Sequence, residues 1–165
     1  MTLCLTVLWF LGAVGPQEPR SLWIYNAHTH EERRDRPFVQ YGLVETQRWA
    51  GWSRIFRSWR TQERRTVNPR LLRVLAQIQS YFGGRRLELV SGFRSPKDPG
   101  DLHSYHQLAR AADFYIRGVA NEALYAYCRT LTNVGCGYYP NGIHVHVDVR
   151  SRNSIWTDPQ TRNRN

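Results

Sequence analysis

The chain has 165 residues, of which 41% are hydrophobic and 13% aromatic, which fits one globular domain and excludes a disordered or fibrous protein. Its 23 Lys and Arg residues outnumber 13 Asp and Glu residues, for a formal net charge of +10, and Lys97 is the only lysine. Because arginine suits planar contacts with carboxylates and phosphates, we expect an anionic polymer as partner. The sequence has no helix-turn-helix, RNA-binding or zinc-finger signature, so we do not expect nucleic acid.

The N-terminus resembles an export segment. Residues 3–14 form an apolar run too short to span a bilayer comfortably, and small residues precede Pro16 as in a cleavage site. No Lys or Arg precedes the run, which departs from the usual pattern, and a buried N-terminal strand or helix is the alternative. We predict a signal peptide at 1–16, one domain at 17–165 and no transmembrane anchor.

The first elements combine a strand with a well-marked helix. Residues 22–25 are typical of a short strand, whereas residues 32–66 are rich in Arg and Trp and have no clean period. Asn68 and Pro69 form a strong helix start, with Asn as N-cap and Pro at the first helical position, and the glycines at 83–84 end the helix. Its apolar stripe consists of Leu71, Leu72, Leu75, Ile78 and Phe82.

The second half of the chain continues the same mixture of strands and helices. We expect, in order, a strand at 87–93, a loop at 95–103, a strand at 111–116, a helix from Asn121, a strand at 134–139, a tight turn at 140–142 and an Arg-rich tail ordered through Trp156. This order indicates an α+β fold.

Residues 142–149 alternate strictly between apolar and polar side chains, which is typical of a half-buried β-strand. Four apolar side chains are expected to face the core: Ile143, Val145, Val147 and Val149. The polar side chains share the other face: His144, His146 and Asp148. Two imidazoles are therefore neighbours on one face of this strand.

A carboxylate and a third imidazole complete a set of metal ligands. Asp113 lies opposite the apolar side chains of its strand, and a carboxylate in that position needs a partner because burying an unpaired charge is costly. His106 lies seven residues earlier. Catalytic zinc takes three such protein ligands and keeps a fourth position for water, which favours hydrolysis. The alternative is an ordinary polar sheet face, with Asp113 paired to Arg110 or Arg117.

Two of the three cysteines remain once the predicted signal, which contains Cys4, is removed. Cys128 comes late in a predicted helix and Cys136 enters the next strand, so a disulfide and two buried thiols are both open. A nucleophilic role is not expected for Cys136, because it lies between two glycines with no local basic partner.

Several motifs together resemble the zinc D-Ala-D-Ala peptidase group, and most closely its murein endopeptidase K-like branch. They are Ser91-Gly92-Phe93-Arg94-Ser95-Pro96, Ser104-x-His106 followed by Asp113, Gly137-Tyr138-Tyr139-Pro140 and His144-x-His146-x-Asp148, with further likeness at Asn26-x-His28-Thr29, Arg57-x-x-Arg60 and Trp156. The likeness runs from about residue 22 to 157. The wider superfamily includes lysostaphin-type peptidases and the zinc domain of hedgehog proteins.

The resemblance implies zinc on His106, Asp113 and His146, with His144 as the catalytic histidine and Arg94 stabilising the substrate carbonyl or oxyanion. It also implies a small antiparallel sheet that carries the zinc site and packs against helices. The chain departs from the family at Ala109 and at His30, where glycine is usual. We expect the ligand loop to tolerate Ala109, the His30 side chain to be solvated and His103 to lie at the pocket rim. The alternatives are an accidental metal binder at His30, a fourth ligand at His103 and a plain surface ion pair at Arg94.

The function implied is hydrolysis of peptide bonds in peptidoglycan by a monomeric endopeptidase of the bacterial periplasm or cell surface. A D,D- or L,D-carboxypeptidase and a non-catalytic, zinc-stabilised cell-wall binding domain are the alternatives. A carboxypeptidase needs a closed pocket with a cation, whereas an endopeptidase needs a groove open at both ends. Residues 54–65 and the loop at 97–100 are candidates for the walls of either.

Overall fold

The computed structural model describes residues 21–35, 46–98 and 104–159, and the predicted signal peptide and His103 lie outside these ranges. In chain order the elements are β1 (Leu22–Asn26), β2 (Glu32–Asp35), α1 (Thr46–Ile55), α2 (Pro69–Tyr81), β3 (Leu87–Ser91), β4 (Ala111–Ile116), α3 (Asn121–Cys128), β5 (Val134–Tyr138), β6 (Val145–Val149) and β7 (Ser154–Thr157). Among the described residues, no helix is long and apolar enough to cross a membrane.

One seven-stranded sheet, in the order β2-β1-β3-β4-β6-β5-β7, organises the molecule. The pairs β1–β3 and β5–β7 are parallel and the other neighbours are antiparallel. The α+β class is thus confirmed, and the expectation of a small antiparallel sheet is confirmed in part: most strand pairs are antiparallel, but the sheet is larger than expected and includes two parallel pairs. The extra strands include β2 and β7, edge strands of four residues each. The sequence of β2 is entirely charged, and both strands are too short to show a clear period.

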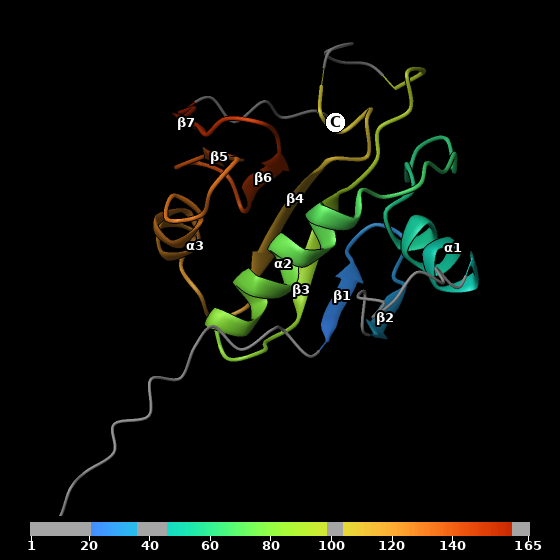
Figure 1. Ribbon diagram of the computed structural model, residues 1–165, viewed down its shortest axis with the longest axis horizontal. Coiled ribbons are helices and arrows are strands. Elements are labelled where there is room, and N and C mark those ends of the chain that lie inside the picture. The colour runs from blue at the N-terminus through green and yellow to red at the C-terminus, as the bar shows by residue number, and fades with distance from the viewer. Residues whose placement is uncertain (1–20, 36–45, 99–103, 160–165) are drawn as a thin grey trace, which may run out of the picture.

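The helix α2 covers one face of the sheet, where it crosses β3 and β4 (Figure 1). Its start is as predicted, because the Asn68 side chain accepts a hydrogen bond of 2.9 Å from the Arg70 backbone N–H and Pro69 is the first helical residue. The predicted stripe is buried except for Phe82, which packs partly buried against the core. The apolar side chains of β4 and β6 meet this stripe: Ala112, Phe114, Ile116, Val145, Val147 and Val149.

The charged segment without a clean period contains β2 and the helix α1. The helix buries Trp52 and Ile55, and Phe56 follows it into the core. These few anchors among polar residues explain why periodicity alone did not reveal a helix.

A disulfide joins Cys128, the last residue of α3, to Cys136 in the middle of β5. Of the two alternatives that the sequence left open, the structure has the bridge. It fixes the short helix against the strand that pairs with β6.

Candidate metal centre

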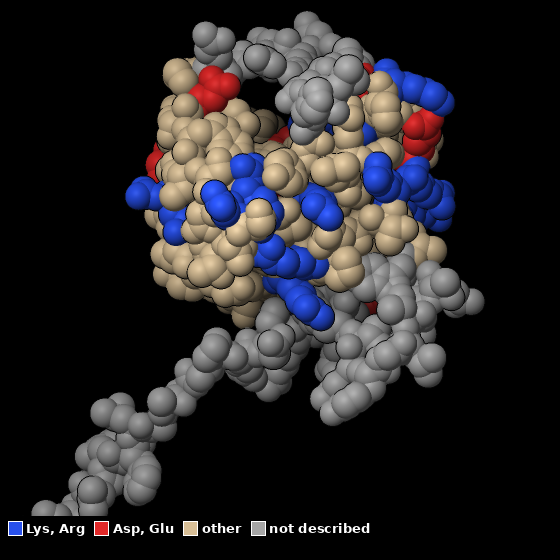
Figure 2. All heavy atoms as spheres, turned by 45° about the horizontal axis from the view of Figure 1, so that its top comes forward, with Lys and Arg blue, Asp and Glu red and all other residues tan. Residues whose placement is uncertain are grey.

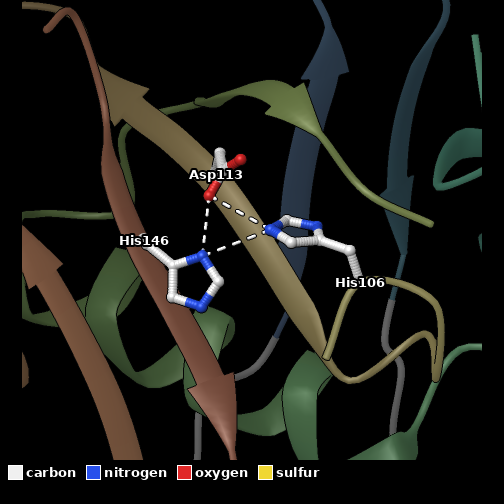
Figure 3. Close-up of side chains that lie close together, drawn as sticks. All are labelled: His106, Asp113 and His146. Atoms are coloured by element: carbon white, nitrogen blue, oxygen red, sulfur yellow. Dashed lines mark hydrogen bonds and ion pairs between the residues drawn. The ribbon is translucent and has the colours of Figure 1, made fainter. Parts of the chain in front are cut away.

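The face of the sheet opposite α2, here called the metal face, carries Asp113, His146 and Asp148. Alternation along β4 and β6 places these polar side chains opposite the core residues, and Asp113 and His146 are direct partners in the antiparallel register. His106 reaches the same place from the loop before β4 (Figure 3). The strand β6 begins only at Val145 and is buried on both faces, so the expectation of a half-buried strand from residue 142 was wrong. Ile143, expected in the core, is 69% exposed because it precedes the paired strand.

The three side chains His106, Asp113 and His146 converge on one point. His106 Nε2 lies 3.2 Å from His146 Nδ1 and 3.3 Å from Asp113 Oδ1, and His146 Nδ1 lies 2.8 Å from Asp113 Oδ1. Tetrahedral zinc with bonds of about 2.0–2.1 Å separates its ligand atoms by about 3.3 Å. The donor set therefore fits a zinc ion, with no side chain needing a large movement.

In His106 and His146, the ring nitrogen that faces away from the convergence point has a hydrogen-bond partner. The other nitrogen of each ring therefore directs its lone pair toward that point. His106 Nδ1–H donates to the Gly92 carbonyl at 2.6 Å, and His146 Nε2–H donates to Asp148 Oδ2 at 3.1 Å. Such outer partners fix the tautomer and orientation of metal-binding histidines. The arrangement leaves His106 Nε2 and His146 Nδ1 available as ligands.

The charges of this buried group favour the binding of a cation. Burial alone would raise the pKa of the Asp113 carboxyl, but charge interactions and hydrogen bonds with His106 and His146 hold it well below its usual range. Burial opposes protonation of His146, yet Asp113 and Asp148 raise its pKa overall. A bound metal ion would take the place of that proton, because ligand imidazoles bind metal in the neutral form.

Arg94 contacts the carboxylate from outside the group. Its Nη2 donates to Asp113 Oδ2 at 2.5 Å, and its Nε donates to the Ser91 hydroxyl at 3.0 Å. Asp113 therefore pairs with Arg94 and not with Arg110 or Arg117. The guanidinium engages Oδ2, so Oδ1 is the oxygen that faces the imidazoles.

Asp148 is fully buried and links His146 to Arg150. Arg150 Nε donates to Asp148 Oδ1 at 2.6 Å, and the guanidinium also lies 4.5 Å from the centre of the Tyr105 ring, next to His106 in the chain. Gly135 leaves the space for this pair, because a Cβ there would lie 2.2 Å from Asp148 Oδ2. A glycine in β5 thus makes room for the carboxylate that orients His146.

His144 lies beside Tyr139 at the end of the hairpin between β5 and β6. Their ring centroids are 5.0 Å apart, and both side chains are half-buried. Burial lowers the pKa of His144; Asp113 acts in the opposite direction, while His146 and Arg94 lower it further. A neutral imidazole at neutral pH is able to accept a proton.

Trp156, on the edge strand β7, completes the group around the hairpin. Its ring centroid lies 5.2 Å from that of His146, and it packs on Gly137, where a Cβ would lie 2.6 Å from the indole. Burial raises the pKa of Tyr139, the neighbouring Trp156 indole lowers it, and the charges of Asp113 and Asp158 act in the same direction as burial.

The two candidate wall segments, 54–65 and the described part of 97–100, are joined to each other. Ser58 donates to Asp98 Oδ2 at 2.8 Å, and Glu63 accepts hydrogen bonds from Ser95 and Lys97. The backbone N–H of Phe93 also donates to the Phe56 carbonyl at 2.6 Å. The two wall segments are therefore attached to each other and, through Phe56 and Phe93, to the chain next to Arg94.

The family of peptidases described as peptidoglycan L,D-endopeptidase MepK matches residues 15–154 of the chain. The chain belongs to this family. It is 30% identical over 141 residues to the peptidoglycan L,D-endopeptidase MepK of Escherichia coli K12, and the matched region covers 79% of this chain and 77% of that protein. It is also 30% identical over 150 residues to the probable peptidoglycan L,D-endopeptidase MepK of Haemophilus influenzae, and this match covers 84% of this chain and 80% of that protein.

The two positions at which the resemblance would place glycine lie where the backbone is left-handed. Ala109 has φ 51° and His30 has φ 56°, a region that glycine enters without the steric cost of a Cβ. Ala109 is buried, whereas His30 is exposed and hydrogen-bonds through Nδ1 to the Tyr25 hydroxyl at 2.8 Å. The expectation of a solvated His30 side chain is confirmed, with this one tether.

The sequence alone indicates no role for four residues around this centre: Asp148, Arg150, Tyr139 and Trp156. Asp148 was visible as the third polar residue on the face of His144 and His146. The link between Tyr139 and Trp156 depends on the parallel pairing of β5 with β7, for which the sequence has no local signal.

Proposed function

We propose that this protein is a zinc-dependent endopeptidase that hydrolyses an L,D peptide bond of peptidoglycan. The observation that carries the proposal is the buried group of His106, Asp113 and His146, whose ligand atoms lie within zinc-binding distance of one another beside a neutral histidine. The name of the MepK-like family supplies the bond and the polymer.

Zinc bound to the three proposed ligands would polarise the scissile carbonyl and lower the pKa of a water molecule. His144, whose lowered pKa leaves it neutral, would accept a proton from the attacking water and pass it to the amine that leaves when the C–N bond breaks. Its half-buried position beside the ligand strand supports this role. In total, water is added across one amide bond.

Arg94 is proposed to stabilise the carbonyl oxygen as negative charge develops on it. Its contacts with Ser91 and Asp113 use Nε–H and an Nη2–H among the five N–H groups of a guanidinium. Those contacts also fix its orientation before substrate binds, and fixed donors are the effective ones in such stabilisation.

The charge of the molecule suits a large anionic substrate. Figure 2 shows Arg and Lys side chains spread over much of the visible face, with fewer acidic side chains between them. This distribution and the net charge of +10 favour association with the carboxylate-bearing wall polymer. We place the protein in the periplasm or at the cell surface, where that polymer occurs.

Digestion of defined muropeptides, followed by mass spectrometry, tests the proposal. The zinc-loaded protein is expected to convert cross-linked dimers that contain an L,D bond to monomers, and the chelated protein is expected to leave them intact. Dimers with only D,D cross-links serve as the specificity control. Release of a single terminal alanine from monomers, with every dimer untouched, would favour a carboxypeptidase, and no cleavage under several metals would refute the enzyme.

A further inference from the structure

We propose that the Tyr139 hydroxyl is a second donor to the developing oxyanion of the substrate, acting together with Arg94. This inference rests on the proposed function, because it assigns a catalytic role within the same site. It concerns a residue for which neither the sequence motifs nor the metal-binding geometry gives a role.

The direction of the Tyr139 side chain follows from the alternation along β5. Along β5, Gly135 borders Asp148 and Gly137 borders Trp156, so these two glycines belong to the metal face. Tyr139 continues this row of alternate residues, while Tyr138 points the other way, stacks on Tyr125 and hydrogen-bonds to Glu122. Tyr139 is therefore the side chain that this row presents after two glycines.

The Tyr139 phenol borders the proposed reacting groups. Its ring lies beside that of His144, with centroids 5.0 Å apart. Beyond the effect of burial, the charge of Asp113 raises the pKa of the phenol and that of Arg94 lowers it. His144 in turn lies two residues before His146 and directly precedes β6. The hydroxyl thus borders the space between the proposed general base and the proposed oxyanion donor.

The phenolic proton of Tyr139 is not used by its neighbour Trp156. Burial, the larger effect, raises the pKa of the phenol and the Trp156 indole lowers it, and an indole N–H can only donate. The phenolic O–H is therefore left to act as a donor. Trp156 is held in turn by its packing on Gly137 and His146, so it acts as a positioning residue for Tyr139.

The test compares Tyr139→Phe with Tyr138→Phe, two substitutions that each remove one hydroxyl from adjacent residues on opposite faces. On a defined cross-linked dimer, Tyr139→Phe should lower kcat by at least about 10-fold with little change in KM, whereas Tyr138→Phe should leave both near wild type. Zinc content and circular dichroism should be unchanged in both variants.

A readout independent of turnover is the affinity for a phosphinate analogue, in which a tetrahedral anionic group replaces the scissile amide. Tyr139→Phe should weaken phosphinate binding by about the factor lost in kcat/KM, while binding of the uncleaved peptide changes little. Trp156→Phe should give a smaller loss, and its combination with Tyr139→Phe should add little, because one variant removes what the other positions.

The outcomes separate this inference from the proposed function. Wild-type protein that cleaves the dimer while Tyr139→Phe stays within twofold of it would overturn the role of Tyr139 and leave the endopeptidase intact. An increase in KM alone would also overturn it, because the hydroxyl would then contribute to binding only. Failure of the wild-type protein itself to cleave any peptidoglycan would refute the function.

Discussion

Two groups of side chains on the metal face differ in how they are held. His106, Asp113 and His146 are 2%, 4% and 8% exposed, and each is held by a second partner: the Gly92 carbonyl, Arg94 and Asp148 respectively. His144 and Tyr139 are half-buried and are held mainly by ring contacts and the Trp156 indole. The first group has the rigidity that metal binding requires, whereas the second has the access that a substrate requires.

Removing one of the proposed ligands should have the largest effect. His106→Ala should abolish stable zinc binding and reduce peptidase activity to background, because two protein ligands remain where three are needed. Metal analysis after dialysis and the muropeptide assay measure both effects. His30→Gly removes an exposed imidazole instead and serves as the control; equal zinc content in the two variants would contradict the assignment of His106.

Removing the proposed general base should reduce turnover without reducing zinc content, which would distinguish the two groups of side chains. His144→Ala should retain one zinc per chain yet lose about 10²–10⁴-fold in kcat, the range for a positioned proton-transfer group. Single-turnover kinetics and metal analysis on the same preparation provide the comparison. A variant that loses zinc together with activity would place His144 in the first group and remove the distinction.

Changing a residue that orients a proposed ligand should weaken zinc binding less than removing the ligand itself. Asp148→Asn keeps the size of the side chain but removes the charge that orients His146, and such changes typically weaken metal binding by about 10–100-fold. Competition with a fluorescent chelator measures this change. Glu122→Gln, which affects an exposed carboxylate bonded to Tyr138, is the control and should bind zinc like the wild type.

The smallest expected effect concerns backbone strain away from the reaction. His30→Gly relieves a left-handed conformation that costs an ordinary residue about 1–2 kcal/mol, offset by about 0.4–1 kcal/mol from the more flexible unfolded chain. The net gain in the free energy of unfolding should therefore be about 0–1.6 kcal/mol, measured by urea denaturation. Ala109→Gly should be closer to neutral, because it also removes a buried methyl group worth about 0.8 kcal/mol. Destabilisation by His30→Gly would show that its bond to Tyr25 outweighs the strain.

The sequence predicted the features that depend on interactions between residues close together in the chain. Alternation placed Asp113, His146 and Asp148 on one face, and the Asn68-Pro69 start fixed α2. What it did not predict depends on pairing between distant segments, as in the parallel contact that brings Trp156 to Tyr139. Ile143 followed the alternation but lies before the first paired residue, where the pattern no longer determines burial. The helix α1 was missed because a few buried anchors, with Trp52 and Ile55 among them, hold it within a charged segment.

The position of β7 has a consequence for the order in which the enzyme becomes active during its export. An exported chain leaves the membrane N-terminus first, and β7 follows every proposed zinc ligand. Strands β3, β4, β5 and β6 are already present when Trp156 follows. A newly exported chain should therefore acquire the ability to capture metal before it has a fully positioned Tyr139. Hydrolytic capacity would then come with the last strand, after the metal-binding scaffold has formed.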